Sequence, residues 1–375
     1  MSHLFRSSRR GVLWLAALLL IVPLLVSACG GQDATSGGTG TNSGGQASGG
    51  SASGSSNSQP VTLHGAGATF PYPLYSRWFD EYHKADGNVT INYDAIGSGG
   101  GVEQITSKTV DFGASDGPMS DDQLAKAPSA ILHIPTVAGA VVVTYNLDLA
   151  QPLELDGETI AKIFAGQITK WNDPALAALN PGVQLPSEDL LVVHRSDGSG
   201  TTDIFTHYLN AVAPSIWGNN LVGKSVEWPA GVGGEGNQGV AAQVQQTPGS
   251  IGYVELAYAD QNGMPYASVK NQAGKFIVPS IDATRAAMEA GLANIPADFR
   301  YFIVNQPGDN SYPIAGLTWL LVYQKQDDAT KGQALVDFIK WAYANGDSFA
   351  EELLYVPLPQ SLKDKVLQTV DTITW

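Results

Sequence analysis

The chain has 375 residues, of which 43% are hydrophobic, so it is long enough for about two domains with sizeable cores. Asp and Glu outnumber Lys and Arg by 35 to 20, which gives a formal net charge of −15. Because nucleic-acid binding requires clustered basic side chains, this balance argues against a nucleic-acid partner.

The first 28 residues have the pattern of an export signal. A basic RSSRR segment is followed by the apolar run GVLWLAALLLIVPLLV and then by SAC, the order of a secretory signal peptide. The VSAC segment resembles a bacterial lipobox, and it contains Cys29, the only cysteine of the chain. We therefore predict that residues 1–28 are a lipoprotein signal peptide and that Cys29 is lipidated. An uncleaved signal anchor is the alternative, because the apolar run is just long enough to span a bilayer.

Residues 29–59 begin with Cys29 and consist almost entirely of Gly, Ser, Thr, Asn and Gln. Such a segment cannot bury enough apolar surface to order itself, so we predict a flexible tether. Together with the signal, the tether predicts an exported protein that is lipid-anchored to the outer face of the cell membrane or lies in the periplasm. A stable anchor requires more than one acyl chain on Cys29.

From residue 60 onward, strand-like and helix-like patterns alternate. The first helix is predicted over 72–84, where Leu74, Tyr75, Trp78, Phe79 and Tyr82 recur at helical spacing. Further strands are predicted over 61–67, 89–97, 110–116, 140–147, 190–195, 250–256 and 319–325, and further helices over 101–109, 201–209 and 332–346. This alternation predicts an α/β sheet with parallel strands.

Four unusual loops follow the predicted strands. They are GAGATF (65–70), GSGGG (97–101), GASDGP (113–118) and HRSDGSGTT (194–202), and all combine glycine with small or hydroxyl-bearing residues. Three lead directly into a predicted helix, whose N-terminus offers unpaired N–H groups and the positive end of the helix dipole. Ser and Thr at one such loop are most simply helix caps. Four of them at the carboxyl ends of strands predict a shared anion site.

Two other patterns favour different functions and fit less well. Ser199 near His194 and Asp197 suggests a hydrolase, but the nucleophile elbow requires glycine at the position of Asp197. GNNLVGKS (218–225) matches the P-loop pattern, but no helix is predicted after it. The six histidines lack zinc-ligand spacing, so no metal or cofactor is predicted.

The segments GAGATFPYPLYSRW, VDFGASDGPMSD, HRSDGSGTT, GVGGEGNQGV and IGYVELAYA, in this order behind a lipobox, resemble the PstS-type phosphate-binding lipoproteins of bacterial phosphate ABC importers. The resemblance runs from about residue 62 to 360. It implies an α/β, two-domain periplasmic-binding-protein-like fold of type II, with a ligand cleft between the domains and two hinge crossovers near residues 137 and 311. Domain I would comprise 62–137 plus 312–375, and domain II would comprise 138–311.

The resemblance also implies a set of phosphate contacts. They are Thr69, Phe70, Ser98, Asp116, Arg195, Asp197, Ser199, Gly200 and Thr201. Two positions depart from the family pattern: Gly99 replaces a serine, and His194 stands where a second basic residue is common. We expect Asp197 to pair with Arg195 and His194 to be a bystander.

Asp116 is the most informative of these residues. An ionised carboxylate only accepts hydrogen bonds, and phosphate near neutral pH keeps at least one O–H whereas sulfate keeps none. Asp116 would therefore accept a hydrogen bond from phosphate and repel sulfate. The resulting prediction is a monomeric, non-enzymatic protein that delivers phosphate to the permease and ATPase subunits of an importer. The alternatives are a tethered phosphohydrolase that uses Ser199 or Thr201 as its nucleophile, and a binding protein for sulfate, molybdate or a phosphonate.

Overall fold

The computed structural model describes residues 60–375, which belong to one compact unit. The predictions for the signal peptide, for Cys29 and for the tether lie outside these residues. Within residues 60–375, no helix combines the length and the apolar character needed to cross a membrane.

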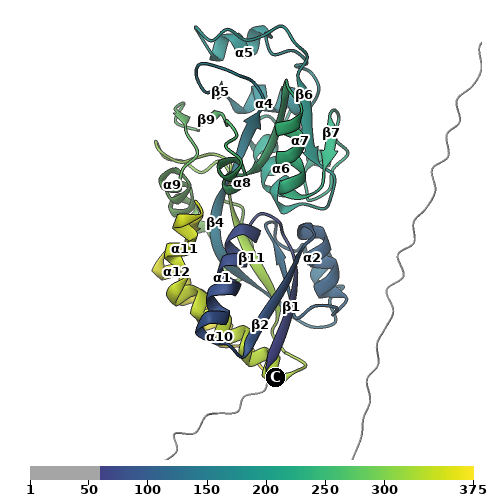
Figure 1. Ribbon diagram of the computed structural model, residues 1–375, viewed down its shortest axis with the longest axis vertical. Coiled ribbons are helices and arrows are strands. Elements are labelled where there is room, and N and C mark those ends of the chain that lie inside the picture. The colour runs from purple at the N-terminus through teal and green to yellow at the C-terminus, as the bar shows by residue number, and fades with distance from the viewer. Residues whose placement is uncertain (1–59) are drawn as a thin grey trace, which may run out of the picture. The chain divides into compact units, whose positions relative to one another are not determined.

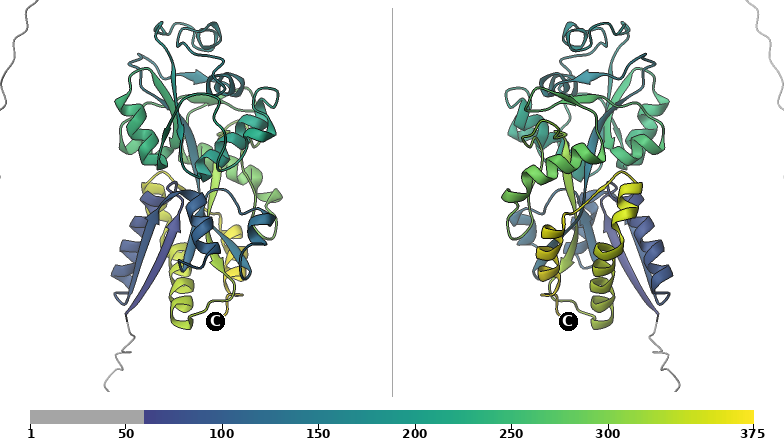
Figure 2. Two further views of the ribbon diagram at one scale, coloured as in Figure 1. Left: turned by 90° about the vertical axis from the view of Figure 1, so that its right-hand side faces the viewer. Right: turned by 90° about the vertical axis from the view of Figure 1, so that its left-hand side faces the viewer.

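A nine-stranded mixed sheet organises this unit, in the order β2-β1-β3-β11-β4-β8-β6-β7, with β12 paired to β4. Elements group at its two ends into a first lobe, which contains β1, and a second lobe, which contains β6 (Figures 1 and 2). The strands of the first lobe are β1 (Val61–Gly67), β2 (Val89–Ala95), β3 (Phe112–Ser115), β11 (Ala315–Tyr323) and β12 (Val356–Pro357). Its helices are α1 (Tyr72–Ala85), α2 (Gly97–Thr106), α3 (Asp121–Leu124), α10 (Ala329–Asn345), α11 (Asp347–Glu352) and α12 (Gln360–Val370).

The second lobe contains the remaining part of the large sheet and a three-stranded sheet, β10-β9-β5. Its strands are β5 (Glu154–Leu155), β6 (Leu191–Arg195), β7 (Val232–Gly234), β8 (Ser250–Glu255), β9 (Ser268–Lys270) and β10 (Phe276–Ile277). Its helices are α4 (Gly157–Phe164), α5 (Pro174–Leu179), α6 (Gly200–Val212), η1 (Asn219–Leu221), α7 (Gly236–Gln246) and α8 (Leu256–Gln261). Helices α9 (Ile281–Gly291) and η2 (Leu292–Asn294) follow, and α9 packs against β4 and β11.

The long strand β4 (Ile131–Tyr145) joins the two lobes. Its first part pairs with β11 of the first lobe, and its second part, from Val141, pairs with β8 of the second lobe. Both pairings are antiparallel, as is that of β11 with β3. The prediction of a parallel sheet is therefore correct only for the two outer blocks, β2-β1-β3 and β8-β6-β7. The apolar runs of β4 and β11 carry no signal for strand direction.

Helix α1 shows how the local pattern produces the packing. The predicted helix is present, and its five residues at helical spacing, Leu74, Tyr75, Trp78, Phe79 and Tyr82, are all buried. The Phe79 ring packs against Tyr93 of β2 and Phe112 of β3, with ring centroids about 6 Å apart. This packing holds α1 against β2 and β3 and thereby positions the loop that joins β1 to α1.

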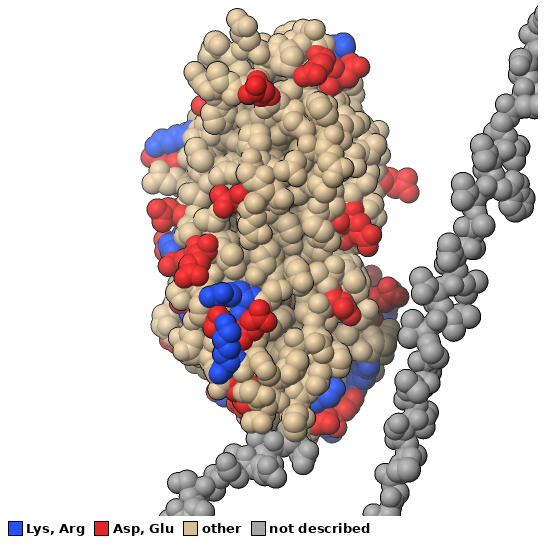
Figure 3. Space-filling view, in the orientation of Figure 1, with Lys and Arg blue, Asp and Glu red and all other residues tan. Residues whose placement is uncertain are grey.

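On the face shown in Figure 3, acidic side chains are scattered and basic ones are few. No broad basic patch covers this face, which agrees with the acidic composition. An anion that binds this protein therefore needs a local site, because the charge of the whole chain repels it.

Candidate functional site

Four segments that are far apart in the sequence meet between the two lobes. Thr69 and Phe70 follow β1, Ser98 lies in the first turn of α2, and Asp116 follows β3. From the second lobe, Arg195 ends β6, and Ser199, Gly200 and Thr201 begin α6. These eight residues are buried, and the Asp197 side chain is 14% exposed. The structure thus brings all nine residues of the predicted site into one cluster, which we call the buried cluster.

The GSGGG segment is not a loop, because residues 97–101 form the first turn of α2. Gly97 has a φ of +85°, and a Cβ atom on it would lie 2.2 Å from the Asp197 carboxylate. Only glycine therefore allows the N-terminus of α2 to approach the loop of the second lobe so closely. Gly99 N–H donates to the Gly198 carbonyl at 2.8 Å, which adds a bond between the lobes.

Ser98 connects the two lobes through its hydroxyl. Its Oγ accepts from Asp116 N–H at 3.1 Å and from Gly200 N–H at 3.0 Å. Since a hydroxyl oxygen has two lone pairs, these bonds leave Ser98 as a donor only. Gly200 must be small here, because a Cβ atom on it would lie 2.5 Å from Ser98 Oγ.

Arg195 is held in a fixed orientation by a buried ion pair. Its Nε donates to Asp197 Oδ1 at 2.7 Å, Nη2 donates to Asp197 Oδ2, and Nη1 donates to Thr201 Oγ1 at 3.3 Å. Burial opposes ionisation of Asp197, but the Arg195 hydrogen bonds and charge outweigh it and hold the pKa of Asp197 below its usual value. The guanidinium is therefore a charged planar fork whose position is set before any ligand arrives.

Asp116 is the acidic group at the centre of the buried cluster. Its Oδ1 accepts from Thr318 Oγ1 at 2.8 Å, and its Oδ2 lies 3.3 Å from Ser98 Oγ. The pairing of β11 with β4 shifts its register between Thr318 and Trp319. Such an irregularity changes the direction in which the side chains beside it point. Burial raises the pKa of Asp116 to about 7, although the bond from Thr318 and the charge of Arg195 favour its ionised form.

Three helices begin beside the buried cluster, namely α2, α6 and α7. Ser199 caps α6, because its Oγ accepts from Thr202 N–H at 3.0 Å. The positive ends of the helix dipoles favour an anion next to these first turns. Among residues 60–375 no group of three or more His, Cys, Asp or Glu side chains has the arrangement of a metal site.

Sequence reasoning missed several residues of this region. Asn237, in the first turn of α7, bonds to both Thr69 and Thr201, and only its glycine-rich segment had been noted. Tyr258 and Tyr355 donate to the Thr69 and Phe70 carbonyls at 2.5 and 2.7 Å. Tyr355 is 285 residues from Phe70 in sequence, and no local pattern marks it as part of a site.

Glu255, at the end of β8, is the second buried carboxyl group of this region. Its Oε2 accepts from Ala257 N–H at 2.8 Å and lies 3.0 Å from the Tyr355 hydroxyl, while its Oε1 has no hydrogen-bond partner. The Tyr355 hydroxyl is thus within donating distance of both the Phe70 carbonyl and the Glu255 carboxyl group. Burial, the largest cause, raises the pKa of Glu255 well above its usual value.

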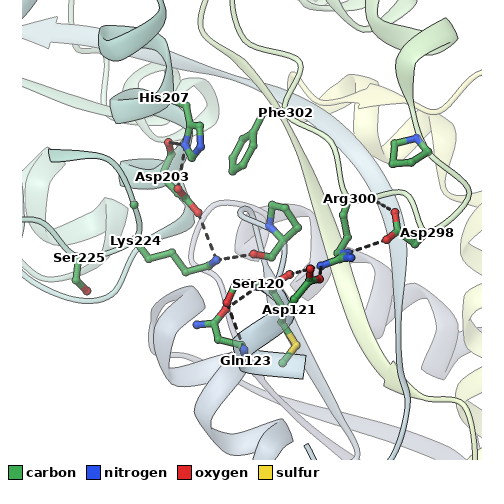
Figure 4. Close-up of a pocket in the computed structure, with 14 residues that line it drawn as sticks. Ser120, Asp121, Gln123, Asp203, His207, Lys224, Ser225, Asp298, Arg300 and Phe302 are labelled. Atoms are coloured by element: carbon green, nitrogen blue, oxygen red, sulfur yellow. Dashed lines mark hydrogen bonds and ion pairs between the residues drawn. The ribbon is translucent and has the colours of Figure 1, made fainter. Parts of the chain in front are cut away.

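An open cavity of about 840 Å³, whose lining residues are drawn in Figure 4, is lined by Pro118 and Asp203, which follow Asp116 and Thr201 of the buried cluster by two residues. Lys224 extends into it and donates to the Pro118 carbonyl at 2.8 Å, with Asp203 Oδ2 3.3 Å away. Pro118 belongs to the first lobe and Lys224 to the second, so this bond also joins the lobes. Arg300 pairs with Asp121 and Asp298 on the other side of the cavity.

The patterns that favoured other functions lack the required structure. His194 Nδ1 lies 2.9 Å from the Arg195 carbonyl, and its ring stacks on Trp228 at 4.8 Å. Neither contact involves Ser199, so His194 is not placed as its base. The P-loop match contains the 3-10 helix η1, and residues 222–231 form no helix after it.

Comparisons with known proteins agree with this geometry. A model of the PBP superfamily domain matches residues 45–345. The chain is 46% identical over 312 residues to the phosphate-binding protein PstS of Xylella fastidiosa strain Temecula1, which covers 82% of this chain and 85% of the relative. It is 45% identical over 312 residues to the phosphate-binding protein PstS of Pasteurella multocida, covering 82% and 90%. It is 37% identical over 362 residues to the phosphate-binding protein PstS3 of Mycobacterium bovis strain BCG, covering 93% and 95%.

Solved structures support the same fold at lower identity. The high affinity periplasmic phosphate-binding protein PfluDING, solved with phosphate bound at pH 8.5, matches with a TM-score of 0.69 and 24% identity, over 82% of this chain and 93% of that chain. A human phosphate binding apolipoprotein matches with a TM-score of 0.66 and 24% identity, over 81% and 93%. The predicted α/β fold of the periplasmic-binding type is confirmed.

Proposed function

The chain belongs to the PstS family of phosphate-binding proteins, and from this premise we propose that it binds one inorganic phosphate in the buried cluster and delivers it to a membrane ABC importer. The observation that carries the proposal is the meeting of Ser98, Asp116, Arg195 and Thr201, drawn from both lobes, in one buried and hydrogen-bonded group. This group combines a fixed cation, hydroxyl donors and helix N-termini, which together suit a tetrahedral oxyanion.

Burying an oxyanion removes its water, so its oxygens need donors from the protein. In the proposed complex the donors are the hydroxyls of Thr69, Ser199 and Thr201, the N–H groups of Phe70 and Thr201, and the Arg195 guanidinium. The Ser98 hydroxyl, which donates to Asp116 in this structure, would turn toward the anion, while Gly200 N–H donates to Ser98 and lines the site. Asp197 acts through Arg195, because it bonds to both Nε and Nη2. The desolvation cost makes the choice of anion strict, since any oxygen left without a donor weakens binding.

Asp116 would determine which oxyanion is accepted. An ionised Asp116 accepts a hydrogen bond from the O–H group of a monohydrogen phosphate. Sulfate has no O–H group to donate, and the carboxylate repels it. Because burial raises the pKa of Asp116 to about 7, the fraction of Asp116 that is ionised in the free protein falls as the pH drops below 7. Sulfate rejection should therefore weaken as the pH falls below 7.

Release of the bound anion requires the lobes to separate. We propose domain I as residues 62–137 plus 312–375 and domain II as residues 138–311, with a hinge motion between them. The predicted crossover at residue 137 falls within β4, and the one at residue 311 falls just before β11. Separation would break the bonds that Ser98, Gly99 and Lys224 make across the lobes.

The proposal extends to the partners and location of the protein. Lipidation at Cys29 and the tether of residues 29–59 would hold the body outside the cell membrane, near the permease and ATPase subunits of the importer. The protein would act as a monomer, without a cofactor and without catalysis. An importer requires its binding protein on the outer side, which agrees with the predicted signal peptide.

Titration calorimetry of the purified protein with phosphate, sulfate and arsenate tests the proposal. Phosphate should bind at one site, and arsenate, which also carries a proton, should bind more tightly than sulfate at pH 8. A protein that binds no phosphate, or binds sulfate equally well, would contradict it. Incubation with a phosphomonoester should release no phosphate, whereas steady release would favour the hydrolase alternative.

A further inference from the structure

Asn237 occupies a central place that the proposed set of phosphate contacts does not include. It is fully buried in the first turn of α7. Its Nδ2 donates to Thr69 Oγ1 at 2.9 Å and to Thr201 Oγ1 at 3.1 Å, and its backbone N–H also donates to Thr69 Oγ1 at 3.1 Å. One amide group therefore links a threonine of the first lobe to a threonine of the second.

The orientation of this amide is fixed by its other end. Asn237 Oδ1 accepts from the Glu255 backbone N–H at 2.9 Å. A backbone N–H can only donate, so the oxygen of the amide must face Glu255 and the nitrogen must face the threonines. The two threonines consequently meet a group that donates to them and cannot accept from them.

As a result, the direction in which each threonine hydroxyl can donate its proton is fixed. Thr69 Oγ1 accepts two N–H groups, both from Asn237, and Thr201 Oγ1 accepts from Asn237 Nδ2 and from Arg195 Nη1. A hydroxyl oxygen with two donors on its lone pairs has only its own proton left to offer. Thr69 and Thr201 are thereby set as donors, at an angle fixed by their neighbours.

We propose that Asn237 is a positioning and specificity-determining residue for phosphate, and this inference rests on the proposed function. It holds Thr69 and Thr201 as obligatory donors, so they reject a proton-bearing oxygen and accept only an unprotonated one. The proton of the bound anion is then confined to the side of Asp116. Because the same amide joins both lobes, closure and orientation of the two hydroxyls occur together.

Asn237→Asp is the sharpest test because it changes one donor group into an acceptor of the same shape. The introduced carboxylate accepts from the threonine hydroxyls and turns their protons away from the anion. We expect phosphate to bind on the order of 30-fold more weakly at pH 8, from the loss of hydrogen bonds to a charged group. Affinity relative to wild type should recover in part as the pH falls, because the introduced carboxyl group can donate one of the two hydrogen bonds once it is protonated.

Asn180→Asp is the matched control. Asn180 is also buried in the second lobe, and its amide makes the same kind of bonds, to Glu154 and Leu176 backbone groups outside the buried cluster. This variant should lose stability but keep the wild-type phosphate affinity within about threefold. Melting curves of each variant without phosphate separate folding defects from binding defects.

A double-mutant cycle with Thr69→Val shows whether Asn237 acts through the hydroxyl. If it does, the fold-losses of Asn237→Asp and Thr69→Val should combine to much less than their product. Independent, multiplicative losses, or an Asn237→Asp affinity within threefold of wild type, would overturn the inference. If Asn237→Asp does not fold, Asn237→Ala serves in the same cycle with the same criteria. A wild-type protein that fails to bind phosphate would instead contradict the proposed function.

Discussion

Replacing Asp116 with asparagine should stabilise the free protein and impair its choice of anion at the same time. In the folded protein the pKa of Asp116 is raised from 3.8 to about 7, so the native state binds a proton that the unfolded state has lost between these pH values. The contribution of Asp116 protonation to the free energy of unfolding is therefore complete below pH 3.8 and is lost as the pH rises through 7. The difference of about 3 pKa units corresponds to a loss of at most about 4 kcal/mol above pH 7.

The introduced asparagine has nearly the same shape as the aspartate and no charge, so the variant should escape this loss. Without phosphate, Asp116→Asn should be more stable than wild type at pH 8, by up to about 4 kcal/mol, and nearly equal to it at pH 4. Denaturant unfolding at the two pH values measures the difference directly. Equal stabilities at both pH values would show that burial does not perturb Asp116.

Binding should change in the opposite direction. Phosphate loses a charge-assisted hydrogen bond of about 1.5–3 kcal/mol, which corresponds to roughly 10- to 150-fold weaker binding at pH 8. Sulfate should bind more tightly to the variant than to wild type, because the repelling carboxylate is absent. Calorimetry with both anions gives the comparison. If the variant rejects sulfate as strongly as wild type does, Asp116 does not distinguish a protonated anion from an unprotonated one.

Two further substitutions test contacts between the lobes. Ser98→Ala leaves the buried Asp116 and Gly200 N–H groups without their acceptor, at about 1–3 kcal/mol each, so phosphate affinity should fall at least about tenfold in calorimetry. Unchanged affinity would mean that Ser98 does not organise the site. Lys224→Met removes the bond to the Pro118 carbonyl and should speed phosphate release by about 3- to 10-fold in stopped-flow measurements, and an unaltered rate would show that this bond does not hold the lobes together.

The sequence predicted best where function and packing leave local patterns. The apolar positions of α1 recur at helical spacing, and all five are buried. The glycine- and hydroxyl-rich loops marked the positions that meet between the lobes, because a close backbone approach restricts them to small residues, as at Gly97 and Gly200.

Other features depend on contacts that no local pattern encodes. The glycines of residues 97–101 disfavour a helix, yet tertiary packing against Asp197 and Gly198 makes them the first turn of α2. The direction of β4 and β11 is set by the sheet, not by their apolar composition. Tyr355 reaches Phe70 across 285 residues, so only the folded chain reveals it.

A crystal structure of the protein with phosphate tests the central claim most directly. We predict one phosphate in the buried cluster, within hydrogen-bond distance of Ser98, Arg195 and Thr201, with one oxygen facing the Asp116 carboxyl group. Phosphate bound only in the cavity beside Lys224 and Arg300, or a buried cluster whose side chains make no contact with it, would contradict the account.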